Sequence, residues 1–322
     1  MKSPPSISVV IPTLNAARWL GPLIDQLSEQ QPGPPDEIIL VDSGSTDGTL
    51  EIASRFPVVK VLSVTQFSHG GARNYGIREA RGDVVVLMTQ DAIPKDGNWL
   101  ARLIQPLESD EVAAVYSRQI PRDDASPMER FFLRDRFPDG PAVVRRHQGP
   151  EAPVYPETFF SNVSSAARRD VWRRFPFDEK LLMGEDQQFA RDTLMAGMAL
   201  VYEPASLVYH SHTYSLTQTF KRYFDSVVAF RQLYQSHGTG TSARLGGGKV
   251  WPEIAYLFRD YPWSIPYFIF YMGFKSAGVI AGHMADRLPP SWCAKLSLHP
   301  AWWMGRSLDK PTANREDVRP HE

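Results

Sequence analysis

The sequence of 322 residues contains a single cysteine, Cys293, which excludes a disulfide framework and any zinc site built from cysteines. It has no internal repeats, and with 43% hydrophobic and 22% charged residues it is not a disordered chain. Its first residues lack the pattern of a secretory signal peptide and lead directly into a strand-like run. We therefore expect a folded protein that is made and kept in the cytoplasm.

The net charge is close to zero, at −1, but the positively and negatively charged residues are unevenly distributed along the chain. Residues 1–212 carry 22 Lys and Arg against 28 Asp and Glu, whereas residues 213–310 carry 11 against 5. A basic, aromatic-rich C-terminal third suggests a surface for anionic lipid or pyrophosphate. Because no nucleic-acid-binding motif accompanies these charges, we expect no nucleic-acid partner.

Long hydrophobic runs are scarce, and only residues 263–282 approach the roughly twenty residues of a membrane span. This stretch contains Pro266 and Lys275 and has no second span beside it, which disfavours a transmembrane helix. Its aromatic residues, together with Lys275, Arg287 and Lys295, suit the boundary between lipid headgroups and acyl chains. We expect it to contact either a membrane surface or a second copy of the protein.

Strand and helix patterns alternate through the first part of the chain. Continuous β-branched and apolar runs predict strands buried on both faces, and apolar residues three and four apart predict helices between them. This alternation is typical of βαβ units and predicts an α/β fold with a mostly parallel sheet, in which ligands bind at the carboxyl ends of the strands. The strands are expected at residues 7–11, 37–41, 58–64 and 83–88, and the helices at residues 19–27, 50–56 and 71–80.

Residues 119–160 are rich in Pro, Arg and Asp and show little periodicity beyond a short segment at 128–133. A segment of this kind is usually a long functional loop or a disordered one. Five of its arginines have two interpretations: they bind a pyrophosphate group, or they form part of a solvated surface. They are Arg130, Arg134, Arg136, Arg145 and Arg146.

Regular patterns return after residue 160. A helix is expected at residues 186–197, a strand at residues 200–209, and a helix from Ser215 to Gly238 that packs on the preceding domain. The polar tail from Asp309 is expected to be disordered.

Polar clusters follow several predicted strands. The Asp42 carboxylate can accept a hydrogen bond from a nucleobase, Arg73 lies at a helix start where phosphate binds, and Asp91 suits a divalent metal. Each of these residues alone could equally be an ordinary turn or capping residue. The order and spacing of the clusters taken together is the more specific indication of a binding site. The clusters are Pro12–Asn15, Asp42–Thr49, His69–Asn74 and Gln90–Ala92.

Together these clusters resemble the family-two glycosyltransferases with the GT-A fold, which transfer sugars from nucleotide diphosphates. The resemblance covers about residues 7–212 and is closest at Ser8–Asn15 and Val41–Thr49. Gln90–Ala92 stands where the family has its Asp-x-Asp metal motif, so that metal binding by this segment falls to Asp91 alone. The residues that the resemblance assigns to the nucleotide sugar are Pro12, Thr13, Asn15, Asp42, Ser45, Gly70, Arg73 and Gln90.

Four segments within this region resemble, in more detail, the bacterial rhamnosyltransferase branch of the family, which uses dTDP-L-rhamnose. The matching segments are Phe67–Asn74, Met88–Ala92, Phe160–Val163 and Tyr209–Ser215. Base selectivity stays open, because Asp42 would bind thymine and uracil alike.

Glu185 and Asp186 lie at the start of the helix expected from residue 186, where acids commonly complement the helix dipole. The resemblance implies instead that this pair supplies the general base that deprotonates the acceptor hydroxyl. Asp186 is expected to be the base and Glu185 to orient or contact the acceptor, since two adjacent residues cannot point at the same atom. Asn162 is expected to line the acceptor side.

His210 and His212 lie two residues apart at a strand end, hence on the same face. They are either an ordinary strand-end pair or, as the resemblance implies, the site of a metal-ligand histidine. With Asp91 and the diphosphate oxygens of the donor they would nearly complete an octahedral Mg²⁺ or Mn²⁺ site. Which of the two histidines binds the metal stays open.

The resemblance predicts a GT-A catalytic domain at residues 1–215, with a nucleotide-sugar half (1–115) and an acceptor half (116–215), then a helical region (216–308) and a tail (309–322). We expect an inverting, metal-dependent transferase that moves L-rhamnose from dTDP-L-rhamnose to a hydroxyl of a glycan or polyprenyl-pyrophosphate-linked glycan in surface-polysaccharide synthesis. Peripheral binding to the inner face of the plasma membrane and homo-oligomerisation through the C-terminal helices stay open. The alternatives are a UDP-hexose or UDP-N-acetylhexosamine donor and a non-catalytic nucleotide-sugar-binding scaffold.

Overall fold

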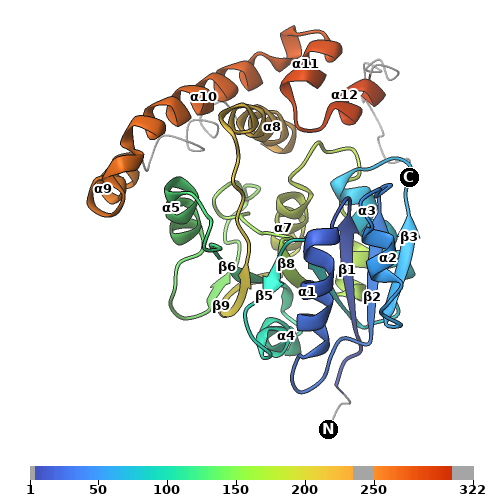
Figure 1. The fold of residues 1–322 in the computed structure, drawn as a ribbon. Helices are drawn as coiled ribbons and strands as arrows, with labels where there is room; N and C mark the ends of the chain where they lie inside the picture. Colours follow the sequence, from blue (N-terminus) through green and yellow to red (C-terminus); the bar gives the residue numbers. More distant parts are fainter. Residues whose placement is uncertain (1–3, 235–249, 307–322) are drawn as a thin grey trace, which may run out of the picture.

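The computed structural model describes residues 4–234 and 250–306, so the expected helix end at Gly238 and the tail from Asp309 lie outside it. The described chain folds around one nine-stranded sheet with helices on both faces, which confirms the expected α/β fold (Figure 1). The strand order is β3 (Val59–Ser63), β2 (Glu37–Asp42), β1 (Ile7–Thr13), β4 (Val84–Met88), β8 (Ser164–Arg168), β6 (Val112–Ile120), β9 (Ala199–Tyr209) and β5 (Ile93–Pro94), and β7 (Val143–Arg145) pairs with β9 beside this path.

The first four strands of the chain pair in parallel, as predicted. Val9 and Ile11 pack into the core on one face of the sheet and Val10 into the core on the other, and all three are fully buried. This burial on both faces explains the continuous apolar run of β1. The helices that connect these strands are α1 (Ala17–Ser28), α2 (Thr49–Ala53) and α3 (His69–Glu79).

Helix α3 lies very close to the sheet because Gly76 faces β1. A Cβ atom at this position would stand 2.3 Å from Cγ1 of Val10, a distance that no packing tolerates. The glycine therefore sets the height of α3 above the sheet, and with it the position of His69 and Arg73 at the carboxyl edge of the strands.

Beyond β4 the pairing becomes mixed, and here the prediction is corrected. β8 runs antiparallel between β4 and β6, whereas β6 and β9 pair in parallel. Among the described strands four pairings are parallel and four antiparallel, so only the N-terminal half is a parallel sheet. The helices of this half are α4 (Trp99–Ile104), α5 (Pro127–Arg136), α6 (Arg169–Arg174) and α7 (Glu185–Met195), with a 3₁₀ turn at Gln105–Glu108.

The segment 119–160, expected as a loop, contains a strand and a helix. The Ser126 hydroxyl caps α5 by accepting the backbone N–H of Glu129 (3.2 Å), and Pro127 occupies the first turn of the helix. Only Met128, Phe131 and Leu133 of α5 are buried, which is too short an apolar pattern to predict the whole helix.

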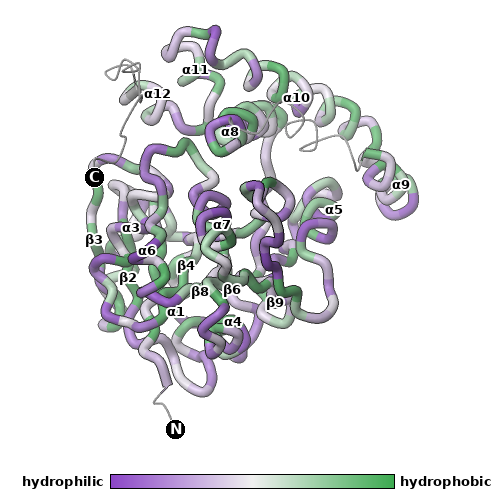
Figure 2. The backbone as a smooth tube through the Cα atoms, turned by 180° about the vertical axis from the view of Figure 1, so that it is seen from behind, coloured by the Kyte–Doolittle hydropathy of each residue, from purple (hydrophilic) through white to green (hydrophobic). Residues whose placement is uncertain are grey.

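The C-terminal region is helical, as expected, and lies across the carboxyl edge of the sheet (Figure 1). Gly278 and Gly282 bring two of its helices into contact, since a Cβ at Gly278 would stand 2.3 Å from the carbonyl oxygen of Phe220. Hydrophobic residues recur along the outer helix α10 (Figure 2), yet none of the described helices combines the length and the hydropathy needed to cross a bilayer. The helices are α8 (Leu216–Tyr234), α9 (Val250–Asp260), α10 (Ile265–His283), α11 (Pro290–Leu296) and α12 (Pro300–Arg306).

Candidate active site

The residues expected to bind the base and ribose meet at the carboxyl ends of β1 and β2. The buried Asp42 carboxylate accepts the backbone N–H groups of Gly44 (2.9 Å) and Ser45 (3.0 Å) and the Ser45 hydroxyl (2.5 Å). Ser45 in turn accepts the backbone N–H of Asn15 (2.8 Å), and Thr13 lies beside Asp42 in the strand register. Asp42 is thus both a strand-end carboxylate and a turn-forming residue, and its loop is held rigidly.

Two side chains fix the turn after β1. Asn15 adopts a left-handed backbone conformation (φ 51°), and its side-chain oxygen accepts the backbone N–H of Thr46 (2.9 Å). Gln90 accepts the N–H of Leu14 (2.8 Å) and donates to the carbonyl oxygen of the same residue (3.0 Å). Pro12 lies half-buried just before this turn. Both polar atoms of Gln90 are engaged, so its geometry favours positioning of the turn over direct contact with a donor.

Asp91, His210 and His212 converge on one point, and their potential ligand atoms all lie within 4.8 Å of one another. His210 Nε2 is 3.7 Å from Asp91 Oδ1, and its Nδ1 is 2.8 Å from the Gln119 side-chain oxygen. Gln119 therefore holds the proton on Nδ1 and leaves the Nε2 lone pair facing Asp91, as metal-ligating histidines require. The three side chains fit a divalent cation.

The protonation states of this trio also suit a metal. Burial lowers the pKa of His210 and of His212, so both imidazoles are neutral near pH 7. Burial raises the pKa of Asp91, but the two histidines and Arg122 outweigh it and lower the pKa overall. Arg122 Nη2 lies 3.6 Å from Asp91 Oδ2, and it comes from the segment after β6.

Replacing Gln119 with leucine is expected to weaken Mn²⁺ binding by about 10- to 100-fold, the usual effect of removing a partner of a metal ligand. The leucine leaves Nδ1 of His210 without its acceptor, so the ring is free to turn or change tautomer. Isothermal titration calorimetry with Mn²⁺ measures the change, and Gln26→Leu at a half-buried position on α1 is the matched control. Equal affinity in the two variants would contradict the assignment of His210.

Glu185 and Asp186 occupy the first turn of α7 and face different partners. Glu185 is buried and its Oε1 lies 3.0 Å from Arg73 Nη1, with both side chains only 6% exposed. Asp186 is half-buried, and its carboxylate accepts the backbone N–H of Gln187 (2.8 Å). Within the described residues Asp186 makes no ion pair. Of the two carboxylates it is therefore the one that is free to accept a proton.

Their environments separate the two pKa values. Burial raises the pKa of Glu185, but Arg73 and His69 more than compensate and hold it below its usual range. Burial, and then the negative charge of Glu185, raise the pKa of Asp186 to about 7, against the opposing effect of Arg73. One carboxylate is ionised and the other is poised near neutral pH, the pattern of a general base with its electrostatic partner.

If Asp186 is the general base, activity is expected to rise with pH up to about pH 7, because its carboxyl group must lose its proton before it can accept one. Below that pH the logarithm of kcat/KM should fall by about one per pH unit. A profile recorded from pH 5 to pH 9 at saturating metal tests this, and one that is already flat at pH 5 would contradict it.

Comparison with known proteins identifies the family. Residues 8–171 match the family model described as glycosyl transferase family 2. The chain belongs to this family. It is 30% identical over 302 residues to the O-antigen chain rhamnosyltransferase RfbN of Salmonella typhimurium, covering 92% of this chain and 96% of that one. It is 32% identical over 306 residues to the O-antigen chain rhamnosyltransferase WbaN of Salmonella anatum, covering 93% and 96%.

Solved structures share the fold. The mannosyltransferase PcManGT from Pyrobaculum calidifontis, in complex with GDP-Man and Mn²⁺, superposes with a TM-score of 0.58 at 18% identity over 88% of this chain and 87% of its own. Glucosyl-3-phosphoglycerate synthase from Mycobacterium tuberculosis, in complex with Mn²⁺, uridine-diphosphate and phosphoglyceric acid, has a TM-score of 0.52 at 21% identity over 71% and 78%. The GT-A fold and the glycosyltransferase family expected from the sequence are confirmed.

Three predicted site residues of this family 2 glycosyltransferase are buried or closely packed. Asn162 is 1% exposed and accepts the Ser165 hydroxyl (3.0 Å), and its role on the acceptor side stays a prediction. Arg73 is buried against Glu185. Gly70 is required by packing, since a Cβ there would stand 2.6 Å from the carbonyl oxygen of Asp178.

Three residues without a predicted role lie close to the candidate site. His69 and His299 meet edge to face with ring centroids 5.0 Å apart, and burial lowers the pKa of each to about 4. Arg222 of α8 reaches Met183 Sδ (3.6 Å), and its charge acts on the histidines of the metal trio and on His299. The sequence offered one sign that Arg222 has a role, because it is a cation within the largely apolar pattern of the helix predicted at residues 215–238. No sequence pattern pointed to His299.

Proposed function

We propose that this glycosyltransferase moves L-rhamnose from dTDP-L-rhamnose to a hydroxyl of a glycan in surface-polysaccharide synthesis, with inversion at the anomeric carbon. The names of the two Salmonella relatives support the sugar and the pathway class, and the alignments span nearly the whole of each chain. The observation that carries the chemistry is Asp186, an unpaired carboxylate with a pKa of about 7 beside the Glu185–Arg73 ion pair.

In the proposed reaction Asp186 accepts the proton of the acceptor hydroxyl as its oxygen bonds to the anomeric carbon. The bond between that carbon and the diphosphate oxygen breaks at the same time, so the nucleoside diphosphate leaves with the electron pair. A divalent cation, Mg²⁺ or Mn²⁺, held by Asp91, His210 and His212 would neutralise charge on the leaving diphosphate. Arg222 supplies further positive charge on the same side of the site.

Two alternatives have weaker support. A UDP-hexose or UDP-N-acetylhexosamine donor would use the same Asp42 loop and the same mechanism. A non-catalytic scaffold is disfavoured because Asp91, Asp186 and His210 are all present and arranged for chemistry.

The acceptor is proposed to be a lipid-linked glycan at the inner face of the plasma membrane. Aromatic side chains stand exposed on the outer helices, with Trp263 at 73% and Phe270 at 63%. Lys275 lies over the rings of Tyr223 and Tyr271 on the same layer. Exposed aromatics beside cations suit the headgroup region of a membrane, and the same face could instead join two copies of the enzyme.

The donor is tested by thermal unfolding with dTDP, UDP, GDP and CDP, each with and without Mn²⁺. A ligand at 100 times its Kd stabilises the folded state by about 2.7 kcal/mol, and we expect dTDP with Mn²⁺ to give the largest shift. A transfer assay with dTDP-L-rhamnose follows. A larger shift with UDP would replace the donor, and no shift with any nucleotide would favour the scaffold.

A further inference from the structure

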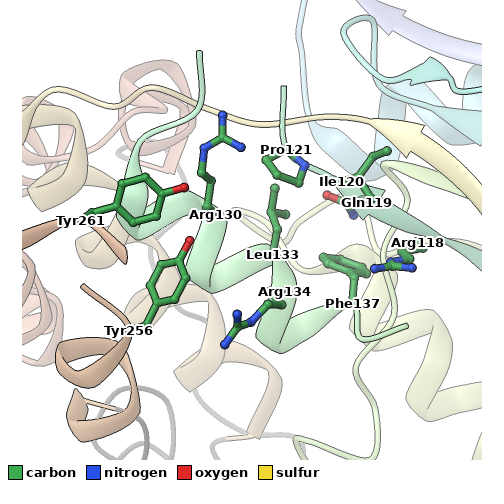
Figure 3. A pocket seen from close by; sticks show the side chains of 10 residues that line it. All are labelled: Arg118, Gln119, Ile120, Pro121, Arg130, Leu133, Arg134, Phe137, Tyr256 and Tyr261. Carbon is green, nitrogen blue, oxygen red and sulfur yellow. The ribbon is translucent and has the colours of Figure 1, made fainter. Parts of the chain in front are cut away.

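A cavity of about 220 Å³ lies between the end of β6, helix α5 and helix α9 (Figure 3). Its polar lining is unusually basic, and nothing in the proposed reaction uses it. The tyrosine hydroxyls point into the cavity beside Arg130. The side chains that matter here are Arg118, Arg130, Arg134, Tyr256 and Tyr261, together with Gln119 at the inner end.

Two of the arginines make no direct ion pair within the described residues. Arg130 is anchored by main-chain carbonyl oxygens of residues 122, 123 and 125, and Arg134 lies over the ring of Tyr256, 4.9 Å from its centroid. Neither has a carboxylate within ion-pair distance in the part of the chain that the structure describes. Arg118 differs, because its Nη1 pairs with the exposed Asp139 at 2.7 Å. The charge of Arg134 also acts on Asp260, but neither guanidinium group is held by a direct ion pair, which leaves both able to bind an anion.

The tyrosines add hydrogen-bond donors to this site. Burial, and then contact with Tyr261, raise the pKa of Tyr256 to about 12, so the hydroxyl keeps its proton at neutral pH. Guanidinium groups only donate hydrogen bonds, and a protonated phenol can donate one as well as accept one, so together they can supply several donors to the oxygens of a phosphate or pyrophosphate.

The cavity adjoins the metal trio and is separate from the nucleotide loops. Gln119 lines it and holds His210, and Arg130 donates to the main chain of Arg122, whose guanidinium contacts Asp91. The nucleotide loops end β1 and β2, and two strands, β4 and β8, separate β1 from β6. The cavity thus lies beside the metal trio and apart from the loops that would hold the base and ribose of the donor.

One exposed aromatic residue contacts the cavity wall, since the ring of Trp263 meets that of Tyr261 edge to face with centroids 5.5 Å apart. Phe258 (61% exposed) and Trp263 (73% exposed) are sequence neighbours of Tyr256 and Tyr261, and Phe270 follows on α10. An amphiphile with a charged head in the cavity would lay its hydrocarbon chain on this face.

We propose that this cavity binds the pyrophosphate of the lipid-linked acceptor, with Arg130 and Arg134 neutralising its charge and the exposed face of α9 and α10 receiving the lipid. The acceptor role rests on the proposed function, whereas binding of the pyrophosphate does not.

The test measures binding without transfer. Inorganic pyrophosphate and farnesyl pyrophosphate are titrated into the enzyme in EDTA, so that no metal can recruit either ligand to Asp91 and the histidines. Arg134→Gln should weaken both by about tenfold or more, as expected for a lost hydrogen bond to a charged group. Arg55→Gln, at an exposed ion pair on α2, should change neither. Tyr256→Phe, which removes only a hydroxyl, is the second variant.

The ligands distinguish the sources of the anion. Tighter binding of farnesyl pyrophosphate than of inorganic pyrophosphate, reduced by Trp263→Ser only for the farnesyl ligand, supports a lipid-linked acceptor. Equal affinities would overturn the lipid assignment, and native affinity in both Arg134→Gln and Tyr256→Phe would overturn the site. Because no donor is present, a failure of the rhamnosyl assignment would not affect these results.

Discussion

Replacing Asp186 with asparagine is expected to lower kcat by about a thousandfold, within the range lost with a general base. The amide cannot accept the acceptor proton, while the Asp42 loop and the metal trio are untouched, so the affinity for dTDP with Mn²⁺ should stay unchanged. Initial rates and dTDP titrations measure the two quantities. Asp192→Asn, six residues later on α7, is the control and should keep native turnover.

The same variant is expected to unfold at a higher temperature than the native enzyme above pH 7. The folded-state pKa of Asp186 is raised, so the favourable contribution of its neutral form is complete at low pH and is lost as pH rises through about 7. Asparagine does not ionise, so the Asp186→Asn variant does not lose this stability as the pH rises. Thermal unfolding at pH 5 and pH 8 should show the larger gain at pH 8, and a gain that is the same at both would contradict the raised pKa.

Replacing Arg73 with methionine is expected to lower the free energy of unfolding by about 3–5 kcal/mol, the usual cost of leaving one partner of a buried ion pair alone. Glu185 would keep its burial without the cation 3.0 Å away. Chemical denaturation measures the loss.

The matched control is Arg55→Met, which breaks an exposed pair with Glu51 and should cost no more than about 0.5 kcal/mol. Adding Glu185→Gln to Arg73→Met should cost less than the sum of the two single changes, because the unpaired charge is then gone. Additive losses would show that the two side chains are not coupled.

The strand-end residues could be predicted from the sequence because topology alone brings them together. Asp42 ends β2, Asp91 follows β4 and His210 follows β9, and the carboxyl ends of these strands lie along the same edge of the sheet. The adjacency of Glu185 and Asp186 likewise predicted that only one of them serves as base, and the structure separates their partners.

The remaining features depend on packing between distant segments. Arg122 reaches Asp91 from the segment after β6, and His299 reaches His69 from the far end of the helical region. Their sequence neighbourhoods carry no pattern for these contacts. Regular structure was expected after residue 160, but the five residues of β8 were not predicted as a strand because so short a segment does not show its type.

The pair of hydrogen bonds between the Gln90 side chain and the Leu14 main chain has a consequence for protein engineering. Its two hydrogen bonds need an amide, which offers an acceptor to the N–H and a donor to the carbonyl oxygen. A shorter, charged aspartate can satisfy at most the N–H and repels the carbonyl. Substituting the acid of the family's Asp-x-Asp motif at this position would therefore loosen the end of β1, so a consensus-guided redesign of this enzyme should leave residue 90 as glutamine.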